Sequence, residues 1–119
     1  MDAGGDATPG TILQLLGDDY ARQILLAADQ EPRTAKELSR ICDVSLATVY
    51  RRISALQDNG LVEDHSTVAD DGSHHRVFET TLEELHVELS DGGIELSVDR
   101  RDELADNFTA LWADIRDST

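Results

Sequence analysis

The sequence predicts a mixed α+β fold, with helices in the first half of the chain and two β-hairpins followed by a helix in the second. Between residues 11 and 58, apolar side chains recur at the three- and four-residue spacing of amphipathic helices. Between residues 63 and 99, short runs alternate apolar and polar side chains and are broken by clusters of Asp, Gly and Ser, as in strands joined by turns. At 119 residues the chain can bury a modest core but is too short for a large enzyme.

The first thirty residues predict a tail and two helices. Residues 1–10 are small and polar and are expected to form a mobile N-terminal tail. Thr11–Leu16 predicts a short helix capped by Thr11, and Asp18–Asp29 predicts a longer one. The apolar stripe of the longer helix is expected to contain Tyr20, Ile24 and Ala27 or Ala28.

A capped helix is predicted from residue 34 onward. Thr34 and Glu37 have the spacing of a capping box, in which the amide of the glutamate donates to the threonine hydroxyl and the carboxylate reaches back to the threonine amide. The Cys42-Asp43-Val44 stretch interrupts the helical spacing, so we expect a turn there. The apolar stripe of this helix is expected to contain Ala35, Leu38 and Ile41.

A second helix is predicted to begin at Ser45, because serine is a good helix cap, and to end at Asn59-Gly60, where a left-handed backbone is tolerated. Its buried face is expected to contain Val49, Ile53 and Leu56. Two short helices joined by about three turn residues form a helix-turn-helix, whose second helix can enter the major groove of DNA. The alternative is an ordinary helical hairpin whose arginines form a solvated face.

The residues outside this buried face are candidates for DNA contact. Those expected to read bases are Ala47, Thr48, Tyr50 and Arg51, because small residues allow close approach and hydroxyl and guanidinium groups can bond base edges. Candidates for phosphate contact in this region are Thr34, Lys36, Ser45, Arg52 and Ser54. Arg52 lies about 100° further round the helix than Arg51, so an internal ion pair is its alternative role.

The stretch TAKELSRICDVSLATVYRRISALQDNGLVE, from Thr34 to Glu63, resembles the winged helix-turn-helix of ArsR-like transcriptional regulators. The similarity is greatest to the small versions common in halophilic archaea and covers roughly Gly17 to Thr80. The resemblance implies a DNA-binding regulator, but not a ligand, because these proteins share a DNA-reading domain and differ in what they sense. Metal-sensing members commonly carry paired cysteines, whereas this chain has only Cys42, so no metal site is expected.

The predicted wing is a hairpin made of Glu63–Val68 and the extended run at residues 76–78, joined by a turn at residues 70–73. Near its tip lie His74, His75 and Arg76, placed to meet backbone phosphate or the minor groove. The alternative is a solvated turn with neutral histidines.

A second hairpin is predicted at Glu84–Asp99, with one apolar face and one acidic face. The apolar face is expected to contain Leu85, Val87, Leu89, Ile94, Leu96 and Val98. Because a lone hairpin is barely stable in water, this face must pack on something.

The chain is predicted to end in a helix from Arg101 to about Arg116. Its apolar stripe contains Leu104, Phe108, Leu111, Trp112 and Ile115. We expect this stripe to be a dimer interface, with the helix packed against its twin or against the second hairpin of the partner; the alternative is that it closes the core of its own chain. The predicted organisation is a tail at residues 1–10, a winged helix-turn-helix domain at residues 11–80, and a β-hairpin with a terminal dimerisation helix at residues 81–119.

The charge is unusual for a nucleic-acid-binding protein. The formal net charge is −15 and the pI about 4.3. One interpretation is that the protein avoids DNA and binds a basic protein; the other is adaptation to molar salt, where excess surface carboxylate keeps a protein dissolved. Residues 33–76 carry six basic and seven acidic side chains, so the excess of acid lies elsewhere. This distribution favours a salt-adapted DNA-binding protein, with cations taken up at the DNA interface.

Other classes of protein are less compatible with the sequence. No apolar run could span a membrane, residues 1–10 do not resemble a secretion signal, and a single cysteine suits a reducing cytoplasm. No glycine-rich phosphate loop or nucleophile-and-base motif is present, so neither an enzyme nor a cofactor is expected. The sequence therefore predicts a cytoplasmic, homodimeric transcriptional regulator that binds double-stranded DNA. The main alternative is a winged-helix module that binds another protein instead.

Overall fold

The computed structural model of the 119-residue chain describes residues 9–101, which form four helices followed by four strands. The elements are α1 (Pro9–Gly17), α2 (Asp19–Gln30), α3 (Ala35–Cys42), α4 (Leu46–Asp58), β1 (Val62–Val68), β2 (His74–Thr80), β3 (Leu82–Ser90) and β4 (Gly93–Arg100). The predicted α+β class is confirmed. The chain divides into two compact units, Met1–Thr80 and Thr81–Thr119, which are described separately below.

Helix α1 begins earlier than the sequence pattern suggested. Pro9 is its first residue and Gly10 its second, so these two residues belong to a helix and not to the expected tail. Proline suits a first helical position, because its fixed φ is already helical and the amide it lacks would have no partner there. Thr11 therefore lies inside the helix and does not cap it. Ile12 and Leu15 are buried.

Helix α2 is capped by Asp18, whose Oδ2 accepts a hydrogen bond from the amide of Ala21 at 2.7 Å. Its buried residues are Ala21, Ile24, Leu25, Ala27 and Ala28. The expectation that Tyr20 belongs to this stripe is wrong, because its side chain is exposed at the start of the helix. The helix buries small and aliphatic side chains, which allow close approach to α1, α3 and α4.

The two helices of the helix-turn-helix begin at the predicted caps. The amide of Glu37 donates to Thr34 Oγ1 at 3.1 Å and the amide of Thr34 donates to Glu37 Oε1 at 2.9 Å, which confirms the capping box. Ser45 caps α4 and accepts from the amide of Thr48 at 3.1 Å. Between the helices, Asp43 adopts the left-handed conformation with φ 56°. These caps define where each helix starts and stops.

The buried face of α3 differs from the prediction by one position. Cys42 is buried and Ile41 is exposed. At 100° per residue, Cys42 lies about 20° from Ala35 around the helix, whereas Ile41 lies about 120° from it. The face that packs on α4 therefore passes through Ala35, Leu38 and Cys42.

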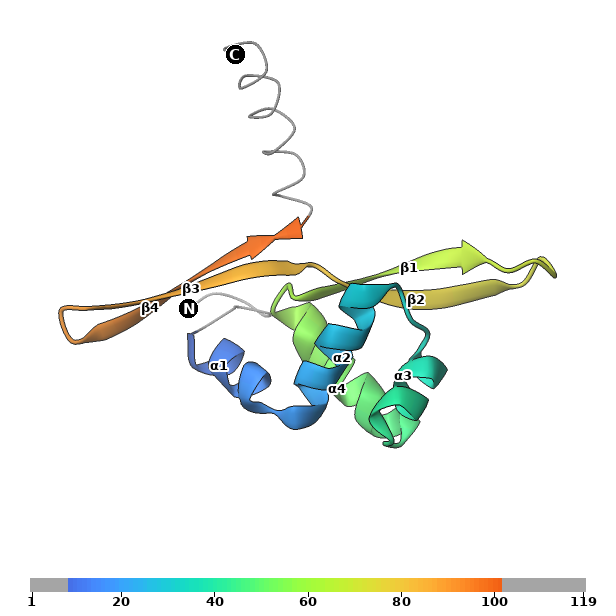
Figure 1. The fold of residues 1–119 in the computed structure, drawn as a ribbon, viewed down its shortest axis with the longest axis horizontal. Helices are drawn as coiled ribbons and strands as arrows, with labels where there is room; N and C mark the ends of the chain where they lie inside the picture. The colour runs from blue at the N-terminus through green and yellow to red at the C-terminus, as the bar shows by residue number, and fades with distance from the viewer. Residues whose placement is uncertain (1–8, 102–119) are drawn as a thin grey trace, which may run out of the picture. The chain divides into compact units, whose positions relative to one another are not determined.

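The hairpin β1–β2 closes the first unit. Its strands pair antiparallel from Val62↔Thr80 at one end to Val68↔His74 at the other. Arg33 forms an isolated bridge to Phe78, with backbone bonds of 3.0 and 2.8 Å, and Thr80 Oγ1 donates to the carbonyl of Leu25 at 2.7 Å. Helices α2, α3 and α4 lie together on one side of this hairpin (Figure 1). The largest fully buried side chains of this unit are Phe78, Ile12, Ile24, Leu38, Ile53, Leu56, Leu61 and Val49.

The second unit contains the antiparallel pair β3–β4. The register runs from Leu82↔Arg100 to Ser90↔Gly93, with an irregularity between Leu82 and Glu84. Asp91 and Gly92 turn the chain with positive φ values of 52° and 75°. The predicted dimer-interface residues Leu104, Phe108, Leu111, Trp112 and Ile115 lie outside the described residues. Within residues 9–101, every helix is too short or too polar to traverse a bilayer.

One ion pair joins distant parts of the first unit. Arg52 on α4 donates from Nε and Nη2 to the two carboxylate oxygens of Asp18, at 2.9 and 3.2 Å. Of the two roles expected for Arg52, the structure shows the internal ion pair. The hydrogen bond from Arg52 holds the pKa of Asp18 below its ordinary value of 3.8, outweighing partial burial, which acts in the opposite direction. Asp18 thus both caps α2 and fixes α2 to α4.

We expect Asp18→Ala to lower the free energy of unfolding by about 1–2 kcal/mol at pH 7, because a helix cap and an ion pair are lost together. Asp18→Asn keeps a capping oxygen and should cost less. Since folding lowers the pKa of Asp18, the carboxylate contributes fully above its ordinary pKa of 3.8 and loses this contribution as the pH falls through the folded pKa. The difference between wild type and Asp18→Asn in urea denaturation should therefore shrink below about pH 4.

Asp19→Asn is the matched control, because Asp19 pairs with Arg22 in an exposed salt bridge of the kind that contributes little. Equal losses for Asp18→Asn and Asp19→Asn would contradict the proposed coupling of α2 to α4.

Candidate nucleic-acid interface

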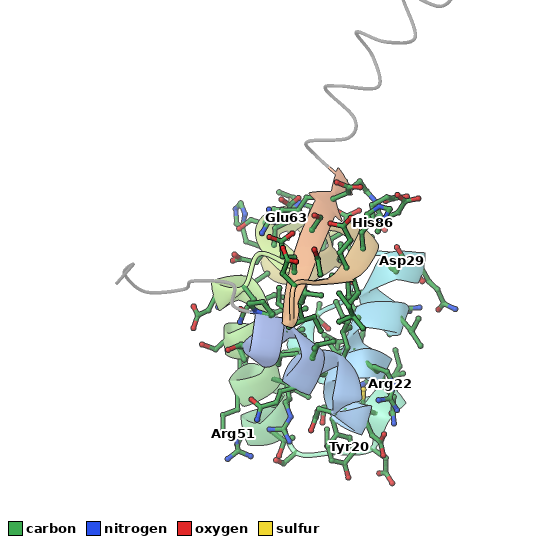
Figure 2. All side chains as sticks on the ribbon, turned by 90° about the vertical axis from the view of Figure 1, so that its left-hand side faces the viewer. Tyr20, Arg22, Asp29, Arg51, Glu63 and His86 are labelled. Atoms are coloured by element: carbon green, nitrogen blue, oxygen red, sulfur yellow. The ribbon has the colours of Figure 1, made fainter. Side chains whose placement is uncertain are left out.

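Helix α4 presents one face to the core and the opposite face to solvent. Val49, Ile53 and Leu56 are buried, which orients the helix about its axis. The exposed residues are Leu46, Ala47, Tyr50, Arg51, Ser54 and Asp58, while Thr48 is half-buried. All four candidate base-reading residues therefore lie on α4 outside its buried stripe, and Figure 2 shows Arg51 projecting outward from this helix.

A short chain of hydrogen bonds runs along this face of α4. Ser45 Oγ donates to Thr48 Oγ1 at 3.1 Å, and Arg51 Nη2 donates to the same oxygen at 3.3 Å. The three residues are spaced three apart, so they lie on one side of the helix. Since Thr48 Oγ1 accepts both bonds, its own hydroxyl proton remains available for another acceptor. This arrangement draws the guanidinium of Arg51 towards the N-terminal end of α4, the end that contacts base edges in helix-turn-helix proteins.

The basic side chains of the described residues differ in their partners. The ion pairs seen among residues 9–101 include Arg22–Asp19, Arg33–Glu31, Arg52–Asp18, Arg76–Asp64 and Arg101–Glu83. By contrast, Lys36, Arg40 and Arg51 are exposed and make no ion pair with any residue that the structure describes. These three cations lie on α3 and α4. The helix-turn-helix thus carries positive charge that no described carboxylate neutralises.

Two residues of this surface were missed by the sequence analysis. Arg40 follows Lys36 by four positions, a spacing that places both cations on one face of α3 and that could have identified it. Leu46 is the first residue of α4 and is exposed, although leucine at a helix start is ordinarily expected to be buried. An exposed apolar side chain at this end of a reading helix can contact the methyl group of thymine.

The wing carries its charges differently. Arg76 Nε donates to Asp64 Oδ2 at 2.6 Å, and the guanidinium carbon lies 5.0 Å from the centre of the Phe78 ring. Gln57 on α4 donates to the other oxygen of Asp64 at 2.9 Å, which links α4 to the wing. The hydrogen bond from Arg76 lowers the pKa of Asp64, so this carboxyl stays ionised. Arg76 is therefore a paired cation on the wing.

The tip of the wing is a tight turn between β1 and β2. Asp71 Oδ1 accepts hydrogen bonds from the amide and the hydroxyl of Ser73, at 2.9 and 2.6 Å, and these bonds lower the pKa of Asp71. His74 and His75 follow at the start of β2 and are exposed, and His75 Nε2 lies 3.1 Å from Ser73 Oγ. Both imidazoles can thus reach a ligand beside the wing.

The structure brings histidines and carboxylates together into groups of potential metal ligands that their spacing in the sequence did not indicate. Glu63, His65 and Glu79 meet on β1–β2, and Glu84, His86 and Asp99 meet on β3–β4; within each group the candidate ligand atoms lie within 4.8 Å of one another. His86 Nε2 lies 3.2 Å from Glu84 and 3.3 Å from Asp99. Each group could offer three ligand atoms, one fewer than a structural zinc site uses. Strand register creates both groups, because Glu63 pairs with Glu79 and Glu84 with Asp99.

A comparison with protein families agrees with these observations. A sequence family described as a helix-turn-helix domain matches residues 6–65, which include α3, the turn and α4, and the chain belongs to this family. A search of curated proteins gave no match. Membership supports DNA binding and transcriptional regulation as the general class of function, because the matched residues contain the helix that enters the major groove in such domains.

Cys42 lies at the end of α3, beside the turn, and is expected to be unreactive. Its side chain is only 5% exposed, and burial raises the pKa of the thiol. Because the thiolate is the reactive form, we expect a thiol reagent such as iodoacetamide to modify Cys42 in native protein at least about tenfold more slowly than in urea. Mass spectrometry of timed samples measures this.

Ile41→Cys in a Cys42→Ala background is the control, because Ile41 is 49% exposed at the neighbouring position. This variant should react quickly in the native state. Equally fast native modification of Cys42 would support a redox-sensing role instead.

Proposed function

We propose that the protein is a sequence-specific, DNA-binding transcriptional regulator that acts as a homodimer. The observation that carries this proposal is the location of its unpaired positive charge. Lys36, Arg40 and Arg51 are exposed on the helix-turn-helix without a carboxylate partner among the described residues, in a chain whose net charge is −15. Other exposed or partly exposed arginines, such as Arg22, Arg33 and Arg76, lie against carboxylates.

In this proposal the residues of α4 read bases. Arg51 can fork onto guanine, Tyr50 and Thr48 can bond base edges, Ala47 allows close approach, and Leu46 can contact thymine methyl groups. The proposed phosphate contacts on the helix-turn-helix are Thr34, Lys36, Arg40, Ser45 and Ser54, with His74 and His75 on the wing. Arg52 and Arg76 hold Asp18 and Asp64, so in this proposal a phosphate contact by either would use the guanidinium N–H groups that the carboxylate leaves free.

In this proposal the acidic composition of the protein is an adaptation to molar salt. Between residues 33 and 76 positive and negative side chains nearly balance, and the excess of acid lies in the remainder. We propose that cations bind between the nearby carboxylates and the DNA, which lets an acidic protein approach a polyanion. This interpretation agrees with the resemblance to small regulators of halophilic archaea.

A homodimer would match the symmetry of an operator. Two copies related by a two-fold axis can place their reading helices in two half-sites about one helical turn apart. The proposed dimer contacts are the apolar residues Leu104, Phe108, Leu111, Trp112 and Ile115. In this proposal the chain binds DNA without catalysing a reaction and needs no cofactor or metal. The alternative, a winged helix that binds only protein, leaves the unpaired cations of α3 and α4 without a role.

Arg51→Ala should weaken binding to specific DNA by at least about fivefold, because one bidentate contact to guanine contributes about 1–3 kcal/mol. The measurement is the affinity for genomic fragments selected by the wild type, in molar potassium chloride. Arg51→Lys should keep most of the affinity for unrelated DNA but lose the preference for the selected fragments, because lysine lacks the planar fork.

Arg22→Ala is the matched control, since Arg22 is also exposed but lies on α2 and pairs with Asp19. It should bind like the wild type. If the folded wild type retained no genomic fragment, or if Arg22→Ala and Arg51→Ala weakened binding equally, the assignment of α4 would be wrong.

The proposed uptake of cations predicts how DNA affinity depends on salt concentration. If about six phosphates per dimer were met by Arg and Lys alone, affinity would fall by about five decades for a tenfold rise in salt. With cations taken up at the interface, we expect a much flatter dependence in a potassium chloride series, or even a rise. Asp43→Asn removes an exposed carboxylate in the turn between α3 and α4 while keeping a residue that tolerates the left-handed backbone. It should make the dependence steeper. A steep loss for the wild type, unchanged in Asp43→Asn, would exclude cation uptake.

A further inference from the structure

The hairpin β3–β4 has an apolar face formed by directly paired residues. Residues opposite each other in an antiparallel pair project to the same face, and so do residues two apart along a strand. The pairs Leu85↔Val98, Val87↔Leu96 and Leu89↔Ile94 therefore form one continuous surface, called the apolar hairpin face below. The opposite face carries the pairs Glu84↔Asp99, His86↔Ser97 and Glu88↔Glu95.

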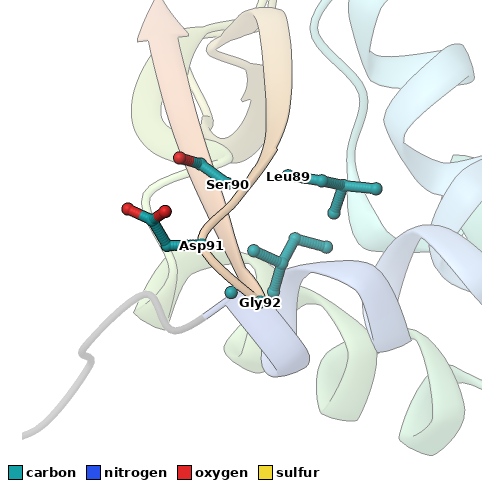
Figure 3. Close-up of a pocket in the computed structure, with 6 residues that line it drawn as sticks. Leu89, Ser90, Asp91 and Gly92 are labelled. Carbon is teal, nitrogen blue, oxygen red and sulfur yellow. The ribbon is translucent and has the colours of Figure 1, made fainter.

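The apolar hairpin face is open to solvent, most of all near the turn. Leu89 is 79% exposed, Val87 48% and Ile94 40%. Figure 3 shows Leu89 projecting from one side of the hairpin and Ser90 and Asp91 from the other, around a shallow hollow at the turn. A two-stranded hairpin is at best marginally stable alone in water and needs a packing partner on its apolar side.

The end of the chain contains a segment of suitable chemistry and length. Residues 102–119 follow the described part of the chain and include the apolar series Leu104, Phe108, Leu111, Trp112 and Ile115, spaced as on one face of a helix. A helix from residue 104 to 115 would extend about 17 Å, and the apolar hairpin face extends about 13 Å from residue 85 to 89. Such a helix is long enough to cover all three cross-strand pairs.

The connection between β4 and this segment indicates which copy supplies it. Strand β4 ends at Arg100, and Arg101 already has helical backbone. Arg101 is fixed at the open end of the hairpin, where its amide donates to the carbonyl of Thr81 and its Nε donates to Glu83 at 3.1 Å. A strand and a helix that fold back on each other are ordinarily joined by two to six loop residues. To cover Leu89, at the far end of its own hairpin, the segment would have to reverse direction immediately after Arg101, whereas the hairpin of a second copy can be approached without such a reversal.

We infer that the apolar hairpin face binds the C-terminal segment of a second copy of the chain, and that the two copies exchange these segments reciprocally. The inference rests on the proposed homodimer and specifies its contact. Of the two dimer contacts expected from the sequence, the inference favours the C-terminal segment packed on the partner's hairpin over the two C-terminal segments packed against each other. Because each copy gives a segment and receives one, the contact closes on two chains and leaves no apolar hairpin face open.

Disulfide trapping between two singly substituted chains tests this directly. Both chains carry Cys42→Ala; one also carries Val87→Cys, and the other carries Trp112→Cys and a mass tag. The full-length proteins are mixed, exchanged and mildly oxidised in molar potassium chloride. We expect the tagged–untagged disulfide to form in at least about fivefold excess over either same-chain pair. Light scattering of wild type should give twice the chain mass of 13.1 kDa.

Glu88→Cys replaces Val87→Cys in the matched control, because Glu88 is adjacent but lies on the acidic face. It should form little of the mixed disulfide. Equal trapping at both positions, or trapping only between two Trp112→Cys chains, would overturn the inference. So would a wild type that stays monomeric, or a Val87→Cys, Trp112→Cys double variant whose disulfide is confined to one chain.

A separate pair of variants keeps this inference distinct from the proposed function. Leu89→Asn should shift the wild-type dimer to monomer and weaken binding to DNA with two half-sites more than to DNA with one, whereas Glu88→Gln should change neither. Arg51→Ala should remain dimeric while losing specific DNA. A dimer that is intact but binds no DNA would refute the proposed function alone, and DNA binding by a dimer insensitive to Leu89→Asn would refute the inference alone.

Discussion

The burial of the apolar stripe of α4 is the constraint on which the proposed DNA-reading surface depends. Val49, Ile53 and Leu56 enter the core of the first unit, and their side chains determine how the helix is rotated about its axis. Tyr50 and Arg51 face solvent because they lie on the other side of this stripe. The ion pair between Arg52 and Asp18 fixes the same rotation from the edge of the helix. The burial of these three side chains thus determines which residues of α4 support the helix and which remain accessible to a ligand.

The charged side chains differ between the helix-turn-helix and the other elements of the structure. On α2, the wing and the second hairpin, arginines contact carboxylates of the same unit, as in Arg22–Asp19, Arg76–Asp64 and Arg101–Glu83. Surface pairs of this kind contribute little stability, so their main effect is to reduce the positive potential of those regions. On α3 and α4 the exposed cations keep their full charge towards solvent. A strongly acidic protein can in this way present a local surface that suits a phosphate backbone.

Features specified within a few residues could be predicted from the sequence, whereas features that depend on distant partners could not. The caps at Thr34 and Ser45 have local signals, and the helical period correctly placed Tyr50 and Arg51 on the exposed side of α4. Tyr20 and Ile41 were misplaced because apolar character alone does not say which side chains meet a neighbouring helix. The partner of Arg52 lies 34 positions away in the chain, and the groups around His65 and His86 arise from strand register. The local signals identified the exposed face of α4, and tertiary contacts decided which of the neighbouring charges are already paired.

Molar salt would act very differently on the two contacts proposed for this protein. At 1 M salt the Debye length is about 3 Å, so attraction between separated charges is almost abolished and only groups in direct contact still interact. Hydrogen bonds from Arg51 and Thr48 to base edges act at contact distance and survive this screening. The apolar hairpin face has no charge to screen, so its burial against a second copy keeps its strength. A regulator that dimerises through apolar contacts and reads DNA at contact distance therefore uses the interactions that concentrated salt leaves intact. Its many carboxylates can then serve hydration of the surface without weakening either contact.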